Sequence, residues 1–174
     1  MTEKRELLEK LEDAKLIDVV KNYRQYGYDE EVRSAAINIL KERGITEDDL
    51  KMGGNFSNHT YDNAEDSYRS YCNNSKIAFA LYITLLLFIV AIPVVNFTNG
   101  TLVGVLLILK IICTISYLAF ITVSFINHSD FYKAINKKIS SADIMIYYTV
   151  GMPFYIFMYF FYKSQMNEEM KMIQ

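Results

Sequence analysis

The sequence predicts an all-α protein, in which a small N-terminal helical domain is followed by a polytopic helical membrane domain. Charge is concentrated in residues 1–75, which hold 16 acidic and 11 basic side chains, against 4 and 7 in residues 76–174. Apolar residues recur at helical spacing in the first part, and three long, almost uncharged runs occupy the second. This asymmetry indicates a soluble part before a membrane part.

The N-terminal domain is expected over residues 1–52. In the segment DEEVRSAAINILKERGITEDDL, one apolar stripe repeats at the helical period, and Arg33 falls on the exposed face of the same helix. The stripe consists of Val32, Ala35, Ala36, Ile39 and Leu40. Asp29 is the expected N-cap, Gly44 the left-handed residue that ends the helix, and Thr46 the cap of a further short helix.

Three tyrosines surround the connection before this helix: Tyr23, Tyr26 and Tyr28, with Gly27 between them. A domain of roughly 50 residues buries too little surface to be more than marginally stable alone. The domain is therefore either a simple helical cap or a module that docks on a cytosolic partner or on copies of itself. The three tyrosines are the candidate interaction surface.

The segment AAINILKERGITEDDLK, with its L-x-x-R-G-I helix ending, resembles a short helical module that precedes membrane spans in uncharacterised bacterial membrane proteins. The resemblance covers about 25 residues and carries over no functional residue. It implies a bacterial inner membrane as the location.

Residues 53–75 are polar and are expected to form a linker, and residues 76–174 a transmembrane domain. About 20 apolar residues cross a hydrocarbon core, so spans are expected over 77–95, 101–126 and 144–162. Gly151 and Pro153 interrupt the last run, and proline removes a backbone donor. We expect a third span kinked there; the alternative is a re-entrant hairpin, which protein or water must cover.

Lysines set the expected orientation, because cytoplasmic loops carry the positive charge. Lys76 precedes the first run, and the loop after the second contains Lys133, Lys137 and Lys138. These three lysines are candidate contacts for anionic lipid headgroups. The N-terminal domain and this loop are thus expected in the cytoplasm. The tail would lie outside after three spans, or inside after a re-entrant hairpin.

Lys110 interrupts the second run, where an ammonium group is costly and often functional. It either extends to the outer headgroups, as long basic side chains do, or contributes to a pore or helix contact. Tyr148, Tyr155 and Tyr159 follow helical spacing in the third run and are candidates for the same role. Buried tyrosine hydroxyls seek partners, so this face is expected to point toward protein.

Several function classes are not expected. The acidic first half argues against nucleic-acid binding. His128 and Asp130 lack the further ligands that a metal needs, and the two cysteines form no metal motif. No nucleophile with a base, intramembrane acid or phosphate-binding glycine loop is present, so neither enzymatic activity nor a cofactor is expected.

Two hypotheses remain. One is a membrane-anchored adaptor or regulatory subunit that acts through the cytosolic helical domain. The other is a small pore, which three spans can form only as a homo-oligomer with polar span residues lining the centre. Membrane lipid and further copies of the chain are the partners expected in both cases.

Overall fold

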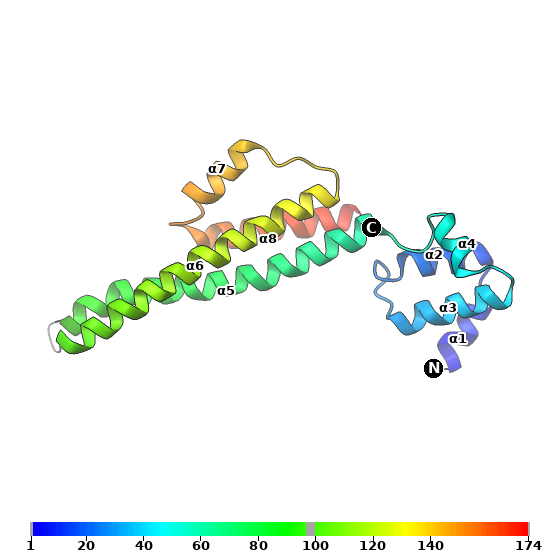
Figure 1. Ribbon diagram of the computed structural model, residues 1–174, viewed down its shortest axis with the longest axis horizontal. Helices are drawn as coiled ribbons and strands as arrows, with labels where there is room; N and C mark the ends of the chain where they lie inside the picture. Colours follow the sequence, from blue (N-terminus) through cyan, green and yellow to red (C-terminus); the bar gives the residue numbers. More distant parts are fainter. Residues whose placement is uncertain (1, 97–99, 174) are drawn as a thin grey trace. The chain divides into compact units, whose positions relative to one another are not determined.

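The computed structural model describes residues 2–96 and 100–173, and its eight helices are joined without any strand in these ranges. The chain divides into two compact units, of which the first ends at Asn63 and the second runs from Ala64 to Ile173. Figure 1 shows the helices of each unit. The predicted all-α class is therefore confirmed.

The first unit contains α1 (Thr2–Glu9), α2 (Asp13–Asn22), α3 (Glu30–Glu42) and α4 (Glu47–Met52). These helices share one apolar core, and the stripe predicted on α3 supplies nearly half of it. The buried members are Leu8, Leu16, Val19, Val20, Val32, Ala36, Ile39, Leu40 and Leu50. Ala35 is only partly buried at its edge.

Capping residues fix where these helices begin and end. The Asp29 carboxylate accepts a hydrogen bond from the Val32 amide at 2.9 Å, as an N-cap does. Gly44 follows α3 with φ of 92°, a conformation that glycine adopts without strain. Thr46 and Asp49 form a capping box, and the Thr46 hydroxyl that donates to Asp49 lowers the pKa of that carboxyl. The box therefore stabilises α4 at neutral pH and weakens as acid protonates Asp49.

The prediction that Arg33 lies on an exposed face is wrong. Its guanidinium sits over the rings of Tyr23 and Phe56, at 4.8 and 4.4 Å from their centroids. It also donates to the Phe56 carbonyl oxygen at 2.9 Å and pairs with Glu30. An arginine can cover apolar rings with its plane while its nitrogens remain hydrogen-bonded. The residues after α4 create this environment, which helical spacing within α3 cannot reveal.

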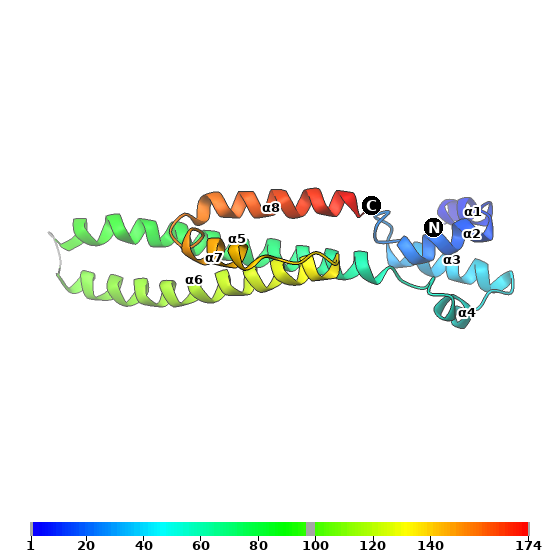
Figure 2. The same ribbon diagram turned by 90° about the horizontal axis from the view of Figure 1, so that it is seen from above.

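The second unit is built on α5 (His59–Asn96) and α6 (Gly100–Ala134), two long helices that run antiparallel. The shorter α7 (Ser141–Thr149) and α8 (Tyr155–Met172) lie along one end of this hairpin (Figures 1 and 2). The predicted polar linker of residues 53–75 is helical from His59 onward, continuous with the first apolar run. Most residues of this segment have modest helical propensity, but they can extend a helix whose nucleus is already formed, because each added residue gains a backbone hydrogen bond.

Within the described residues, α5 and α6 are the two helices long and apolar enough to cross a membrane. The third run, residues 144–162, does not form the single kinked helix that we predicted. α7 ends at Thr149 and α8 begins at Tyr155, so a turn of residues 150–154 separates them. α8 runs back along the hairpin from this turn, which matches the geometry of the alternative re-entrant hairpin (Figure 2).

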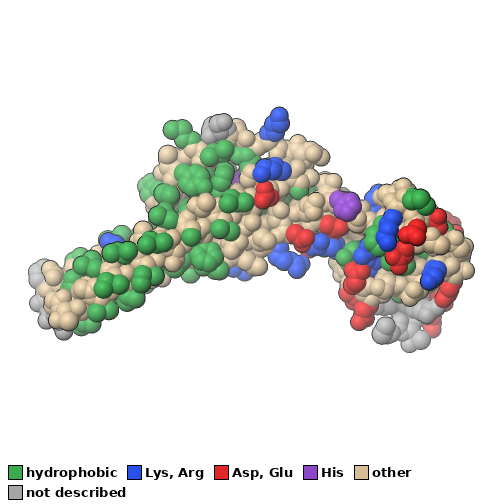
Figure 3. Space-filling model, in the orientation of Figure 1, with side chains coloured by type: hydrophobic (Ala, Val, Ile, Leu, Met, Phe, Trp, Pro, Cys, Tyr) green, Lys and Arg blue, Asp and Glu red, His purple; other side chains and the backbone are tan. Residues whose placement is uncertain are grey.

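The helices of the second unit meet along buried stripes at helical spacing. The stripe of α6 comprises Cys113, Tyr117, Ile121, Ser124, His128, Phe131 and Tyr132. That of α8 comprises Tyr155, Tyr159, Tyr162, Met166 and Met170. Ala78 of α5 is fully buried, whereas Val90 and Ile108 are 67% and 61% exposed. Apolar side chains cover much of the half of the hairpin that lies at the left of Figure 3, as expected of a surface in contact with lipid.

Ala36→Asp should unfold the first unit. Ala36 is fully buried among the core side chains, and an unpaired carboxylate there costs several kcal/mol, comparable with the stability of so small a domain. Hydrogen–deuterium exchange on the full chain should show rapid exchange throughout α2–α4. Ser34→Asp adds the same group at an exposed position of the same helix and should leave exchange unchanged. Equal protection in both variants would contradict the assignment of this core.

Candidate functional site

The turn between α7 and α8 is held by two tyrosine hydroxyls. The Tyr82 hydroxyl donates to the carbonyl oxygen of Pro153 at 2.7 Å, and the Tyr117 hydroxyl donates to that of Met152 at 2.8 Å. A break in a helix leaves carbonyl oxygens without their usual backbone partners. The long helices α5 and α6 therefore each supply one of the donors that the turn lacks.

Gly151 makes the tight start of this turn possible. Its amide donates to the Ile146 carbonyl oxygen at 3.1 Å, which is one residue beyond α-helical spacing. A Cβ atom at this position would overlap the carbonyl oxygen of Tyr147. Pro153 then has no amide hydrogen to continue the helix. Together these residues make the turn a built feature of the fold.

The predicted tyrosine face is divided by the turn. Tyr155 and Tyr159 of α8 are buried at 1% and 7% exposure, toward the interior of the unit. Tyr148 lies on α7, is only half-buried and contacts the ring of Phe125 at 5.4 Å. The structure thus brings Tyr155 and Tyr159 into one cluster with Tyr82 and Tyr117, and leaves Tyr148 outside it.

Lys110 lies apart from this cluster. It is half-buried on α6. Its neighbours Leu109 and Ile111 are 46% and 60% exposed. Within one chain, Lys110 therefore joins no polar site with the tyrosines.

The three lysines predicted to contact lipid headgroups have different surroundings. Lys133 pairs with Asp130 at 3.0 Å on the exposed surface of α6. Lys137 pairs with Glu169 of α8. Lys138 is exposed and lines a cavity between α6, α7 and α8.

This cavity has a volume of about 600 Å³ and includes His128 in its lining. His128 is 3% exposed, and neither of its ring nitrogens has a hydrogen-bond partner among the described residues. Its ring lies 4.7 Å from that of Tyr162 and 4.9 Å from that of Tyr132, measured between centroids. The imidazole therefore packs in an aromatic cluster, and its two ring nitrogens make no hydrogen bond within the described residues.

The tyrosines of the first unit separate into two kinds. Tyr26 and Tyr28 are 48% and 46% exposed, and their ring centroids are 5.9 Å apart. The Tyr26 hydroxyl donates to Asp18 at 2.6 Å, and this bond raises the pKa of Tyr26. Tyr23 instead packs under the Arg33 guanidinium. Only Tyr26 and Tyr28 thus form an exposed aromatic pair.

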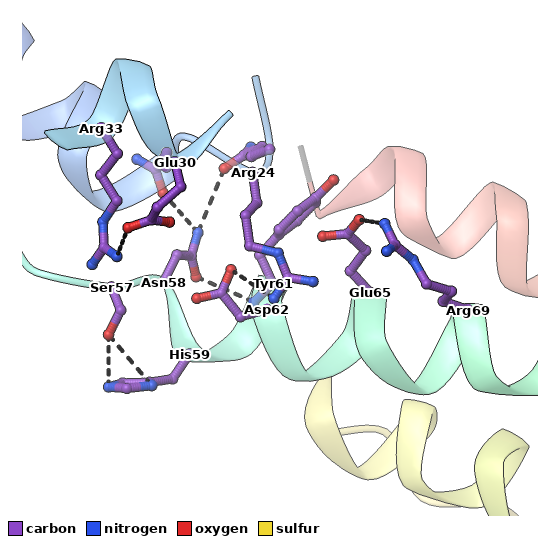
Figure 4. Close-up of polar contacts among 12 residues, drawn as sticks. Arg24, Glu30, Arg33, Ser57, Asn58, His59, Tyr61, Asp62, Glu65 and Arg69 are labelled. Carbon is purple, nitrogen blue, oxygen red and sulfur yellow. Dashed lines mark hydrogen bonds and ion pairs between the residues drawn. The ribbon is translucent and has the colours of Figure 1, made fainter. Parts of the chain in front are cut away.

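The first turn of α5, up to Asn63, belongs to the first unit and is held there by polar contacts (Figure 4). The Asn58 side-chain amide donates to the side-chain oxygen of Asn22 at 2.8 Å, and Arg24 pairs with Asp62 at 3.7 Å. Ser57 Oγ lies 2.9 Å from Nε2 of His59. Ser57 is half-buried and His59 is exposed, and no carboxylate within the described residues is hydrogen-bonded to the ring. The pair lacks the third group of a catalytic triad.

Within the described residues, no group of three or more histidine, cysteine, aspartate or glutamate side chains is arranged to hold a metal ion. No protein-family model, curated protein or solved structure matches the chain significantly. The arguments for function therefore rest on the geometry of the chain itself.

The sequence analysis missed Tyr82 and Tyr117 as partners of the third run, and missed the buried Tyr147 within that run. Tyr82 and Tyr117 are tyrosines well inside long apolar runs, and such a hydroxyl requires a partner. That signal could have identified them as donors to a helix break. Tyr147 is 2% exposed and makes a long contact of 3.5 Å from its hydroxyl to the Ile121 carbonyl oxygen.

Gly151→Ala should destabilise the second unit by about 1–3 kcal/mol, because the added methyl group meets backbone that cannot move aside easily. The measurement is the temperature at which the detergent-solubilised chain loses its monodisperse elution. Gly104→Ala is the matched control, since a Cβ atom there meets open space. Equal stability of the two variants would show that the turn tolerates a side chain.

Proposed function

We propose that this protein is an integral membrane protein without enzymatic activity, acting as an adaptor or regulatory subunit. The first unit docks on a cytosolic protein partner, and α5 and α6 anchor it in a bacterial inner membrane. The carrying observation is the placement of the tyrosines. Tyr155 and Tyr159, the tyrosines of α8 that were candidates for a pore lining, are 1% and 7% exposed inside a single chain, so they are not available to line a channel between copies.

The exposed surface of the first unit supports the docking role. Tyr26 and Tyr28 form an exposed aromatic pair, and tyrosine is enriched at protein interfaces. Met52 and Leu7 are 81% and 61% exposed on the same unit. Its core is closed without them, so these side chains are free to bind a partner.

The alternative is a small homo-oligomeric pore. Lys110 and the surrounding exposed face of α6 are the features that favour it, because copies of the chain could pack there. Against it, the exposed residues beside Lys110 are aliphatic. A water-filled path would need several polar positions along one face.

Two spans and a re-entrant α7–α8 hairpin are the topology that we propose. Tyr82 and Tyr117 lie roughly 8 and 14 Å along their helices from the inner ends of the apolar runs, at about 1.5 Å per residue. The turn they hold would thus enter the inner half of the bilayer. Irregular backbone is tolerated at such depth when protein satisfies it, as these two hydroxyls do. The distribution of lysines supports a cytoplasmic first unit, and with two spans and a re-entrant hairpin the C-terminal tail returns to the same side.

Single-cysteine labelling distinguishes this topology from three spans. In a chain with Cys72→Ser and Cys113→Ala, cysteines replace Met52, Gly100 or Met172. An impermeant maleimide applied to intact cells should label only the cysteine at position 100, in the loop between the two spans. Labelling at position 172 but not at 52 would restore the three-span topology.

A photo-cross-linking amino acid at position 28 tests the adaptor role. We expect an adduct with a distinct cytosolic protein in cells, reduced by Tyr26→Ala because the neighbouring ring is removed. The same amino acid at Ser34, an exposed position of α3, is the control and should give no such adduct.

The pore alternative predicts a different result. The purified chain would then conduct ions in reconstituted bilayers, and Lys110→Leu would abolish the conductance or its anion preference, because rings of charge set ion selection. Such a loss, together with adducts only between copies of the chain, would overturn the adaptor proposal.

A further inference from the structure

The cavity beside His128 is lined by both polar and apolar side chains. Its polar lining includes His128, Tyr132 and Lys138, and its apolar lining includes Ile146, Met158 and Phe161. Its volume of about 600 Å³ is in the range of small-molecule sites. All of these residues belong to the second unit. A cavity with this division suits an amphipathic ligand.

Two buried polar side chains in this lining are unpartnered. His128 is only 3% exposed, and its Nδ1 and Nε2 both lack hydrogen-bond partners in the described part of the chain. The hydroxyl of Tyr132, which is 7% exposed, also lacks one. Buried polar atoms are almost always hydrogen-bonded. A neutral imidazole and a phenol each have a hydrogen to donate, so the missing partner includes an acceptor.

Lysines outnumber carboxylates in the cavity lining, which contains Lys137, Lys138 and Asp143, and this favours an anion as the acceptor. Lys137 is occupied by Glu169, and the Asp143 carboxylate accepts from the Ser140 amide in the capping box of α7. Lys138 has no ion pair among the described residues, which leaves its ammonium group available. One cation and two neutral donors therefore belong to the lining of one cavity: Lys138, Tyr132 and His128.

We propose that this cavity binds one phospholipid. The headgroup phosphate is held by His128, Tyr132 and Lys138, and the first part of an acyl chain lies along Ile146, Met158 and Phe161. His128 follows Ile126, the last residue of the apolar run, by two positions, so His128 lies at the level of the inner headgroups. This inference rests on the membrane location proposed above, but is independent of the adaptor role.

Native mass spectrometry of the full chain in detergent, titrated with dioleoyl phosphatidylglycerol, tests the site. One lipid should bind per chain, and dioleoylglycerol, which lacks the phosphate, should not. Lys138→Ala should weaken binding about fivefold, as expected for one lysine, and Tyr132→Phe about tenfold, as expected for a hydrogen bond to a charged group. Ile146→Trp, which fills cavity volume beside the proposed acyl chain without changing charge, should also reduce binding.

Matched controls separate this site from general attraction to lipid. Lys133→Ala removes a lysine of the same region that does not line the cavity, and Tyr148→Phe removes a tyrosine hydroxyl outside it. Both should bind lipid as the unaltered chain does. Equal weakening by Lys133→Ala and Lys138→Ala would overturn the proposal in favour of surface charge. Displacement of the lipid by millimolar inorganic phosphate would overturn it in favour of a free-anion site. These results leave the cross-linking test of the adaptor role unaffected.

Discussion

The second unit depends on satisfying the backbone where the helix breaks between α7 and α8. Carbonyl oxygens at a helix end need donors, and the surroundings here are apolar side chains. Tyr82 and Tyr117 provide those donors from two different helices. The positions of both long helices are thereby coupled to the turn, and α8 can return along the hairpin to pack its buried stripe.

This constraint explains why the interior of the unit is rich in tyrosine. Tyr155 packs against the rings of both tyrosines that hold the turn, and Tyr159 packs against Tyr155 and Phe79. Their face of α8 therefore becomes part of the core. Tyrosine combines a large apolar ring with a hydroxyl that can reach a backbone oxygen. The same residues that suggested a channel lining along a single helix therefore serve internal packing. That use of tyrosine is the main physical argument for an adaptor over a pore.

The first unit solves a different problem, because its small core leaves little margin of stability. Side chains from distant positions close its edges. Arg43 donates to the carbonyl oxygens of Leu11 and Glu9 at 2.8 and 2.7 Å and pairs with Asp13. Arg33 covers Tyr23 and Phe56 in a similar way. With these contacts, the unit keeps Tyr26 and Tyr28 exposed without exposing its core.

The sequence by itself determined the features that depend on neighbours along the chain. Helical periodicity identified the stripe of α3, Asp29 and Thr46 identified two helix starts, and the length of the apolar runs identified the membrane-spanning parts of α5 and α6. The tertiary structure decided what depends on partners from other helices: the buried position of Arg33, the hydroxyl bonds of Tyr82 and Tyr117, and the division of the third run into α7 and α8. Gly151 and Pro153 indicated where the helix is interrupted. They could not distinguish a kink from a turn, because both lose the same backbone hydrogen bonds. Only donors from other helices, which no local pattern specifies, make the turn stable.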